Sequence, residues 1–142
     1  MTRDDLEAVR DAVERLARVR LLLETGGDDW RAPGVRGSGL GDPTAARALA
    51  RMAALEGLET ERAELEAVTE YGRRLIRGIA KGLGAKYAKV LECHYLGGLS
   101  WAETAKRAGV SKSTALLWRD TACDWADSVG HARAMHGEGA AT

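Results

Sequence analysis

The sequence predicts an all-α protein, with an N-terminal long helical hairpin followed by a C-terminal three-helix helix-turn-helix domain. Two long stretches repeat apolar residues at three- and four-residue steps with charged residues between them, which is typical of amphipathic helices. The segment between them, residues 26–43, holds six glycines and both prolines and therefore predicts a loop. We expect residues 1–82 to form the hairpin, residues 83–128 the helix-turn-helix domain and residues 129–142 a flexible tail.

The first helix is predicted from Thr2 to Thr25. Acidic residues occupy its first turns, where they complement the helix dipole, and Gly26 and Gly27 mark its end. Its apolar stripe consists of Leu6, Val9, Val13, Leu16, Val19 and Leu23.

A second, longer helix is predicted to begin at Asp42 and Pro43, with Asp42 as the N-cap and Pro43 in the first turn. From Thr44 the apolar pattern continues for about 35 residues, or ~50 Å of helix. The first helix alone is too short to cover such a stripe. Two interpretations remain open: two subunits pair through this region, or the chain forms an antiparallel hairpin whose surplus packs on the C-terminal domain. Charged residues and a glycine interrupt the heptad pattern, so the sequence does not establish a regular coiled coil.

The C-terminal domain is predicted to contain one bracing helix, over residues 85–96, and a pair of capped helices. Ser100 is suited to cap the first of the pair, with Glu103 three positions later completing a capping box. Gly109 fits the left-handed residue that ends this helix, and Ser111 caps the next one. A generic helical hairpin is the alternative interpretation. The short turn and the basic residues around it favour a helix-turn-helix that binds DNA.

The second helix of the pair is the predicted recognition helix. Its core-facing stripe is expected to be Ala115, Trp118, Ala122 and Trp125. The opposite stripe and the basic residues beside the turn form the surface predicted for the major groove. We expect Leu116 and Leu117 to contact either thymine methyl groups or a partner protein, and the neighbouring Asp120 to repel phosphate unless it faces a cytosine amino group. The candidate DNA-binding residues are Lys106, Arg107, Ser111, Lys112, Ser113, Thr114, Leu116, Leu117, Arg119 and Thr121.

Acidic and basic residues are unevenly distributed along the chain, although the formal net charge is zero. Residues 1–72 carry ten basic and fifteen acidic residues, whereas residues 73–125 carry ten basic and four acidic ones, a net charge of +6. The basic half therefore contains the predicted helix-turn-helix, as expected of a module that neutralises phosphates.

Residues 95–105, followed by residues 110–114, resemble the promoter-reading C-terminal helix-turn-helix of sigma factors. A closer resemblance is to phage transcriptional regulators of the ArpU and RinA type, because the glycine loop at residues 36–44 and the long charged helix after it also match. The matching parts fall within residues 31–126. This resemblance implies an all-α DNA-binding regulator of phage or prophage genes.

The predicted function is therefore sequence-specific DNA binding in transcriptional regulation, with a recognition helix docked in the major groove. The alternatives are a DNA-packaging oligomer resembling the small terminase subunit of phages, and a sigma-like adaptor that binds RNA polymerase. The expected partners are double-stranded DNA and further copies of the chain, with a dimer favoured, and RNA polymerase is a further candidate partner.

We do not expect an enzyme, a cofactor or a metal site. Cys93 and His94, taken with the later Cys123, His131 and His136, fit no zinc-ligand spacing. The two cysteines are expected to be reduced core residues. No apolar stretch approaches the ~20 residues that span a bilayer, and the N-terminus has no signal-peptide segment, so we expect a cytoplasmic protein without a membrane partner.

Overall fold

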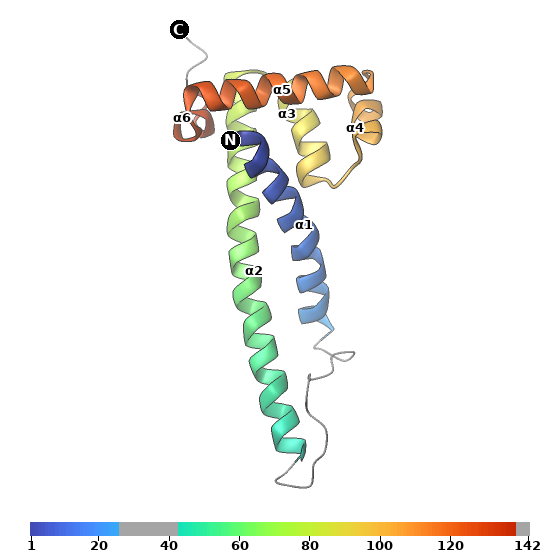
Figure 1. The fold of residues 1–142 in the computed structure, drawn as a ribbon, viewed down its shortest axis with the longest axis vertical. Coiled ribbons are helices and arrows are strands. Elements are labelled where there is room, and N and C mark those ends of the chain that lie inside the picture. The colour runs from blue at the N-terminus through green and yellow to red at the C-terminus, as the bar shows by residue number, and fades with distance from the viewer. Residues whose placement is uncertain (26–42, 139–142) are drawn as a thin grey trace. The chain divides into compact units, whose positions relative to one another are not determined.

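The structure is a computed structural model that describes residues 1–25 and 43–138. All regular structure in these ranges is helical, which confirms the all-α prediction (Figure 1). No helix of the described ranges is long and apolar enough to cross a membrane. The predicted loop 26–43, apart from Pro43, and the predicted cap Asp42 lie outside the described residues. The elements are α1 (Thr2–Glu24), α2 (Pro43–Gly82), α3 (Ala85–Leu91), the π-helical turn η1 (Glu92–Leu96), α4 (Trp101–Ala108), α5 (Lys112–Val129) and α6 (His131–Met135).

The chain divides into two compact units, Arg15–Glu66 on the one hand and Met1–Glu14 with Ala67–Thr142 on the other. This division differs from the predicted boundary between residues 82 and 83. The difference arises because the first turns of α1 and the last turns of α2 share one apolar core with the helices that follow.

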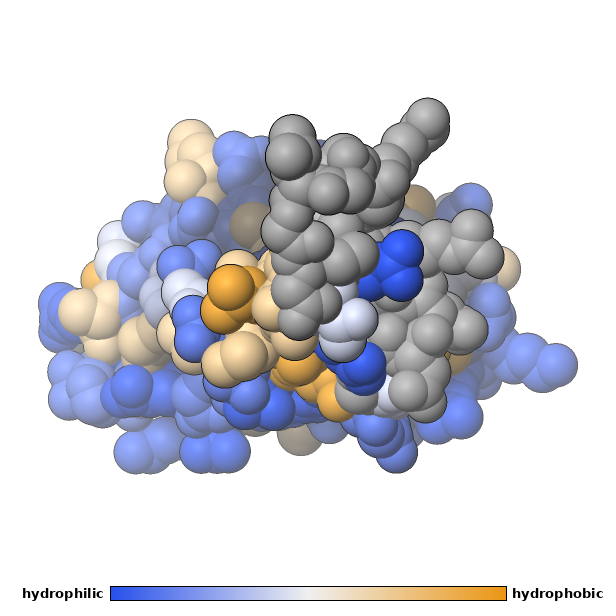
Figure 2. Space-filling view, turned by 90° about the horizontal axis from the view of Figure 1, so that it is seen from below, coloured by the Kyte–Doolittle hydropathy of each residue, from blue (hydrophilic) through white to orange (hydrophobic). Residues whose placement is uncertain are grey.

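In the unit Arg15–Glu66, α1 and α2 are joined by ion pairs at the surface. Arg15 Nε lies 2.6 Å from Glu61 Oε1, and Arg20 Nη2 lies 3.3 Å from Glu66 Oε1. On α2, Leu49 is 68% and Met52 58% exposed. Figure 2 shows apolar atoms of the described residues reaching the surface between hydrophilic ones. At 40 residues, or about 60 Å, α2 is slightly longer than the predicted helix.

The core of the other unit draws side chains from all of its helices. Gly72 lets α1 approach α2 closely, because a Cβ atom placed there would lie 2.5 Å from Val9 Cγ1. Above this contact, α5 packs on both α3 and α4 (Figure 1). The fully buried members of this core include Leu6, Leu75, Ile79, Val90, Leu91, Tyr95, Ala115, Ala122, Ala126 and Ala134.

The segment 129–142, predicted to be a flexible tail, contains the ordered helix α6 over residues 131–135. Ala134 is fully buried against the last turns of α2. A Cβ atom placed on Gly78 would lie 1.9 Å from the carbonyl oxygen of Ala134, so only glycine permits this contact. In the described part of this segment, the small side chain of Ala134 allows close packing, so small residues there do not indicate fraying.

A polar cluster ties α6 to the start of α1. Asp127 Oδ1 accepts hydrogen bonds from the backbone nitrogen of Thr2 at 2.8 Å and from its hydroxyl at 2.6 Å. His131 Nε2 lies 2.7 Å from the same hydroxyl, and its Nδ1 lies 2.5 Å from the Tyr71 hydroxyl. Asp5 Oδ2 is 3.4 Å from His131 Nδ1. These hydrogen bonds satisfy the polar atoms of the buried Thr2. They also connect the start of α1 with the end of α5 and the start of α6.

Candidate nucleic-acid interface

The helix α4 has the predicted Ser100 cap and the predicted glycine end, but the Glu103 carboxylate pairs with the Ser100 hydroxyl and not with its backbone N–H as a capping box would. Ser100 Oγ accepts a hydrogen bond from the backbone nitrogen of Glu103 at 3.2 Å and donates one to Glu103 Oε1 at 3.0 Å. At the other end, Gly109 adopts the left-handed conformation with φ of 71°. The backbone nitrogen of Val110 then donates to the carbonyl of Ala105 at 3.0 Å, which closes a Schellman motif.

The turn between α4 and α5 consists of residues 109–111. Ser111 caps α5, because its Oγ accepts a hydrogen bond from the backbone nitrogen of Thr114 at 3.1 Å. Val110 is half-buried and packs against the core between the two helices. The capped, three-residue, glycine-containing turn has the length and composition of a helix-turn-helix connection.

The exposed side of α5, which we call the outer face, consists of Lys112, Ser113, Leu117, Asp120 and Asp124. Leu117 is 61% exposed and is the large apolar side chain of this face. The outer face carries a single basic residue, at its N-terminal end, and becomes acidic toward its C-terminal end. Only the first turns of α5 therefore suit contact with phosphates.

The other candidate residues on α5 are less accessible. Leu116, Thr114 and Thr121 are half-buried. The hydroxyl of Thr121 donates to the carbonyl of Leu117 at 2.9 Å, and Ser111 Oγ donates to Thr114 Oγ1 at 2.9 Å. The hydroxyl protons of Ser111 and Thr121 are therefore already engaged, and these two side chains can meet a ligand mainly as acceptors, whereas Thr114 Oγ1 accepts the Ser111 hydrogen bond.

Arg119 does not lie on the outer face, contrary to the expectation that placed it among the DNA-binding residues. It is only 8% exposed. Its Nε donates to Asp120 Oδ1 at 2.9 Å, and its guanidinium lies 5.2 Å from the centre of the Trp101 ring. The guanidinium thus neutralises the carboxylate that was expected to repel phosphate, and it fixes α5 to the start of α4.

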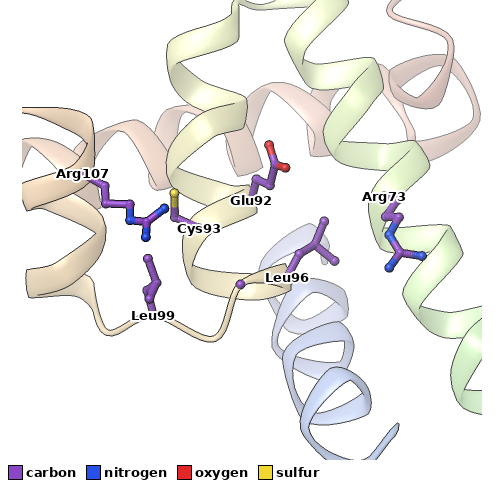
Figure 3. A pocket seen from close by; sticks show the side chains of 7 residues that line it. Arg73, Glu92, Cys93, Leu96, Leu99 and Arg107 are labelled. Atoms are coloured by element: carbon purple, nitrogen blue, oxygen red, sulfur yellow. The ribbon is translucent and has the colours of Figure 1, made fainter. Parts of the chain in front are cut away.

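The basic residues predicted around the turn point to different surfaces. Lys106, Arg107 and Lys112 are all exposed. Arg107, however, extends from α4 toward Cys93 and Leu99, where it lines a cleft on the α2 side of the domain (Figure 3). Near the outer face, Lys106 and Lys112 remain the candidates for phosphate contact.

Three aromatic rings in mutual contact brace α4, and no pattern in the sequence predicts them. The His94 ring stacks on the Trp101 ring with centroids 4.0 Å apart, and Tyr95 meets Trp101 edge-on at 5.9 Å. His94 Nδ1 donates to the carbonyl oxygen of Leu99 at 2.7 Å. Burial lowers the pKa of His94, so the ring is neutral and serves as a structural support.

Both cysteines of the chain are free thiols. Cys123 is buried as expected, and burial raises the pKa of its thiol to about 12, so it is unreactive. Cys93 is half-buried and lies in the wall of the cleft that contains Arg107. In the described parts of the chain, no group of three histidine, cysteine or acidic side chains is placed to hold a metal ion.

Comparisons of the chain with protein-family models, with curated proteins and with solved structures found no match.

Proposed function

We propose that this chain is a DNA-binding regulator of transcription that docks the N-terminal half of α5 in the major groove. The observation that carries the proposal is the pair α4 and α5, joined by residues 109–111 with a glycine turn and serine caps at the start of both helices. A recognition helix must present its first turns to base edges while the preceding helix crosses the backbone. The exposure of Lys112, Ser113 and Leu117 meets this requirement.

The same residues suggest how the duplex would be held. Lys106 and Lys112 would neutralise phosphates on either side of the turn, since both are exposed and lie in the last turn of α4 and the first turn of α5. Ser113 has a hydroxyl for a base edge or a phosphate, and Leu117 offers an apolar contact for a thymine methyl group. The resemblance to phage regulators supports a role on phage or prophage promoters.

The test is selection of duplexes from a random pool, followed by mobility shifts across a salt series. Replacing Lys112 with alanine should weaken binding and reduce the salt slope by about 0.9, the value for one phosphate contact on duplex DNA. Arg133→Ala is the matched control, because Arg133 is an exposed basic residue on α6, outside the α4–α5 pair. Failure to enrich any duplex, or equal slopes for both variants, would refute the proposal.

We also propose that the protein acts as a dimer, through the unit Arg15–Glu66. The support is the exposure of Leu49 and Met52, which are three residues apart and therefore on one face of α2. A dimer would hold two recognition helices at a fixed spacing on paired half-sites. Light scattering should give twice the 15.2 kDa chain mass. The variant Leu49→Glu with Met52→Glu should be monomeric, and the control Leu117→Glu should keep the mass of the parent; a monomeric parent would refute the dimer.

A second candidate function, a polymerase-binding adaptor, is favoured by one observation. The outer face pairs the exposed Leu117 with only one basic residue, a composition that also suits a protein partner. In that case Leu117→Glu would abolish capture of RNA polymerase, and no duplex would be enriched by the chain alone.

A further inference from the structure

A basic cleft lies between α2, η1 and α4, on the side of α3 that faces α2. It consists of two adjoining cavities of about 410 and 290 Å³, which share Arg73, Glu92 and Leu96. Figure 3 shows Arg107 reaching into it from α4 and Arg73 extending from α2, with η1 between them. The wall of the second cavity adds Arg77. We call this feature the arginine cleft.

Positive charge in the arginine cleft is poorly compensated. Three exposed arginines, Arg73, Arg77 and Arg107, line it, and the single acidic side chain in its wall is Glu92. In the described ranges no ion pair involves Arg77 or Arg107, and Arg73 reaches Glu70 only at 3.8 Å. Carboxylates or phosphates would pair with such exposed guanidinium groups through two parallel hydrogen bonds each.

The floor of the cleft is apolar. Leu96 and Leu99 line the first cavity, and Ile76, Ala80 and Ala88 line the second. A complementary ligand therefore carries aliphatic groups between its negative charges. The two volumes are near the lower end of the size range of small-ligand sites, so the cleft takes individual side chains and not a whole duplex.

The position of the cleft separates it from the proposed DNA surface. The buried stripe of α5 packs on α3, so the outer face of α5 points away from α3. The second cavity lies on the side of α3 and η1 that faces α2, where Ala88, Glu92 and Leu96 line it, and the first cavity extends past η1 to Arg107 on α4 (Figure 3). A duplex held on the outer face would leave the arginine cleft open to a different partner.

We propose that the arginine cleft binds an acidic peptide segment of a partner protein. Carboxylates of the segment pair with Arg73 and Arg107 at the two sides of the first cavity, and a leucine-like side chain rests on Leu96 and Leu99 between them. A second acidic residue along the segment meets Arg77. This role is independent of DNA binding, and it assigns Arg107 to a protein contact.

The test applies the full chain to an array of immobilised peptides in which glutamates flank leucine in varied order. A second array carries glutamine in place of glutamate. The variant is Arg73→Gln with Arg107→Gln, and the matched control is Arg74→Gln, an exposed arginine on α2 outside the cleft wall. The double variant loses two guanidinium–carboxylate pairs, each discounted because the arginines are exposed, so it should bind the glutamate peptides about ten-fold more weakly.

The outcomes separate this proposal from the DNA proposal. Binding to glutamate but not glutamine peptides, lost in the double variant and kept in Arg74→Gln, supports the cleft. Absence of glutamate-dependent binding overturns it, as does equal binding by the double variant and the control. Loss of duplex binding in the double variant, with peptide binding unchanged, would overturn it in favour of DNA as the occupant. Lys112→Ala should leave peptide binding unchanged, so a failure of the DNA proposal can be distinguished from a failure of the peptide proposal.

Discussion

Replacing Arg119 with alanine should destabilise the fold without removing a phosphate contact. The side chain is 8% exposed, and its guanidinium both pairs with Asp120 at 2.9 Å and lies 5.2 Å from the Trp101 ring. The ion pair is discounted because the Asp120 side chain is 52% exposed, which leaves about 0.5 kcal/mol for it. The cation–π contact and the lost packing of the aliphatic stem add about 1 kcal/mol. We therefore expect the free energy of unfolding to fall by about 1–2 kcal/mol.

Urea denaturation followed by circular dichroism measures this change, with Lys112→Ala as the control. Lys112 is exposed on the outer face, so its replacement should change the free energy of unfolding by less than about 0.5 kcal/mol. The salt slope of duplex binding should behave in the opposite way, falling for Lys112→Ala and staying constant for Arg119→Ala. The reasoning fails if Arg119→Ala keeps the parent stability and lowers the salt slope, because the guanidinium would then be contacting phosphate.

Further predictions concern the close packing of α6 and the polar cluster at the start of α1. Gly78→Ala should lower the free energy of unfolding by about 1–3 kcal/mol, because its Cβ atom meets the fixed backbone of Ala134, and hydrogen exchange in α6 should increase. Gly57→Ala, also on α2 but with no atom within 4 Å of its Cβ, should raise that free energy by about 0.5–1 kcal/mol; equal effects of the two variants would contradict this packing. Hydrogen bonds from Thr2 hold the pKa of Asp127 below its ordinary value, so its contribution to stability is present above that value and is lost as the pH falls through the lowered pKa. Asp127→Asn should flatten the acid side of the stability profile, and an unchanged profile in acid denaturation would argue against the cluster.

The elements that the sequence predicts correctly are those whose cause is local. Ser100, Gly109 and Ser111 act through hydrogen bonds or dihedral angles within three or four residues, so the spacing of residue types is sufficient to place them. The length of α1 follows in the same way from a periodic stripe that ends in glycine. The stripe predicted opposite the core was only partly right, because Lys112, Ser113, Leu117 and Asp120 are exposed but Leu116 and Thr121 are half-buried. Of the predicted core stripe, Ala115 and Ala122 are buried, whereas Trp118 and Trp125 are half-buried.

The side chains that sequence reasoning misplaced depend on contacts that are distant in the chain. Arg119 follows Ala115 by four residues and precedes Ala122 by three, so its spacing put it on the buried stripe, yet its charge suggested the surface. Its burial requires the Trp101 ring of α4 as well as the adjacent Asp120 carboxylate, and the sequence alone does not bring Trp101 against Arg119. Ala134 was missed for a similar reason, because only the opposing Gly78 makes its small side chain a close contact.

The basic residues within 73–125 therefore do not form one continuous surface. Lys106 and Arg107 are neighbours in the last turn of α4, but Arg107 lines the arginine cleft. Arg119 is buried, and on the outer face itself Lys112 is the single cation. If Lys106 and Lys112 supply the phosphate contacts of one subunit, the salt slope should be about −2 per recognition helix. A slope near −5 per helix in the same mobility-shift series would require the cleft arginines to contact DNA as well, and the division of this domain into two binding surfaces would then be wrong.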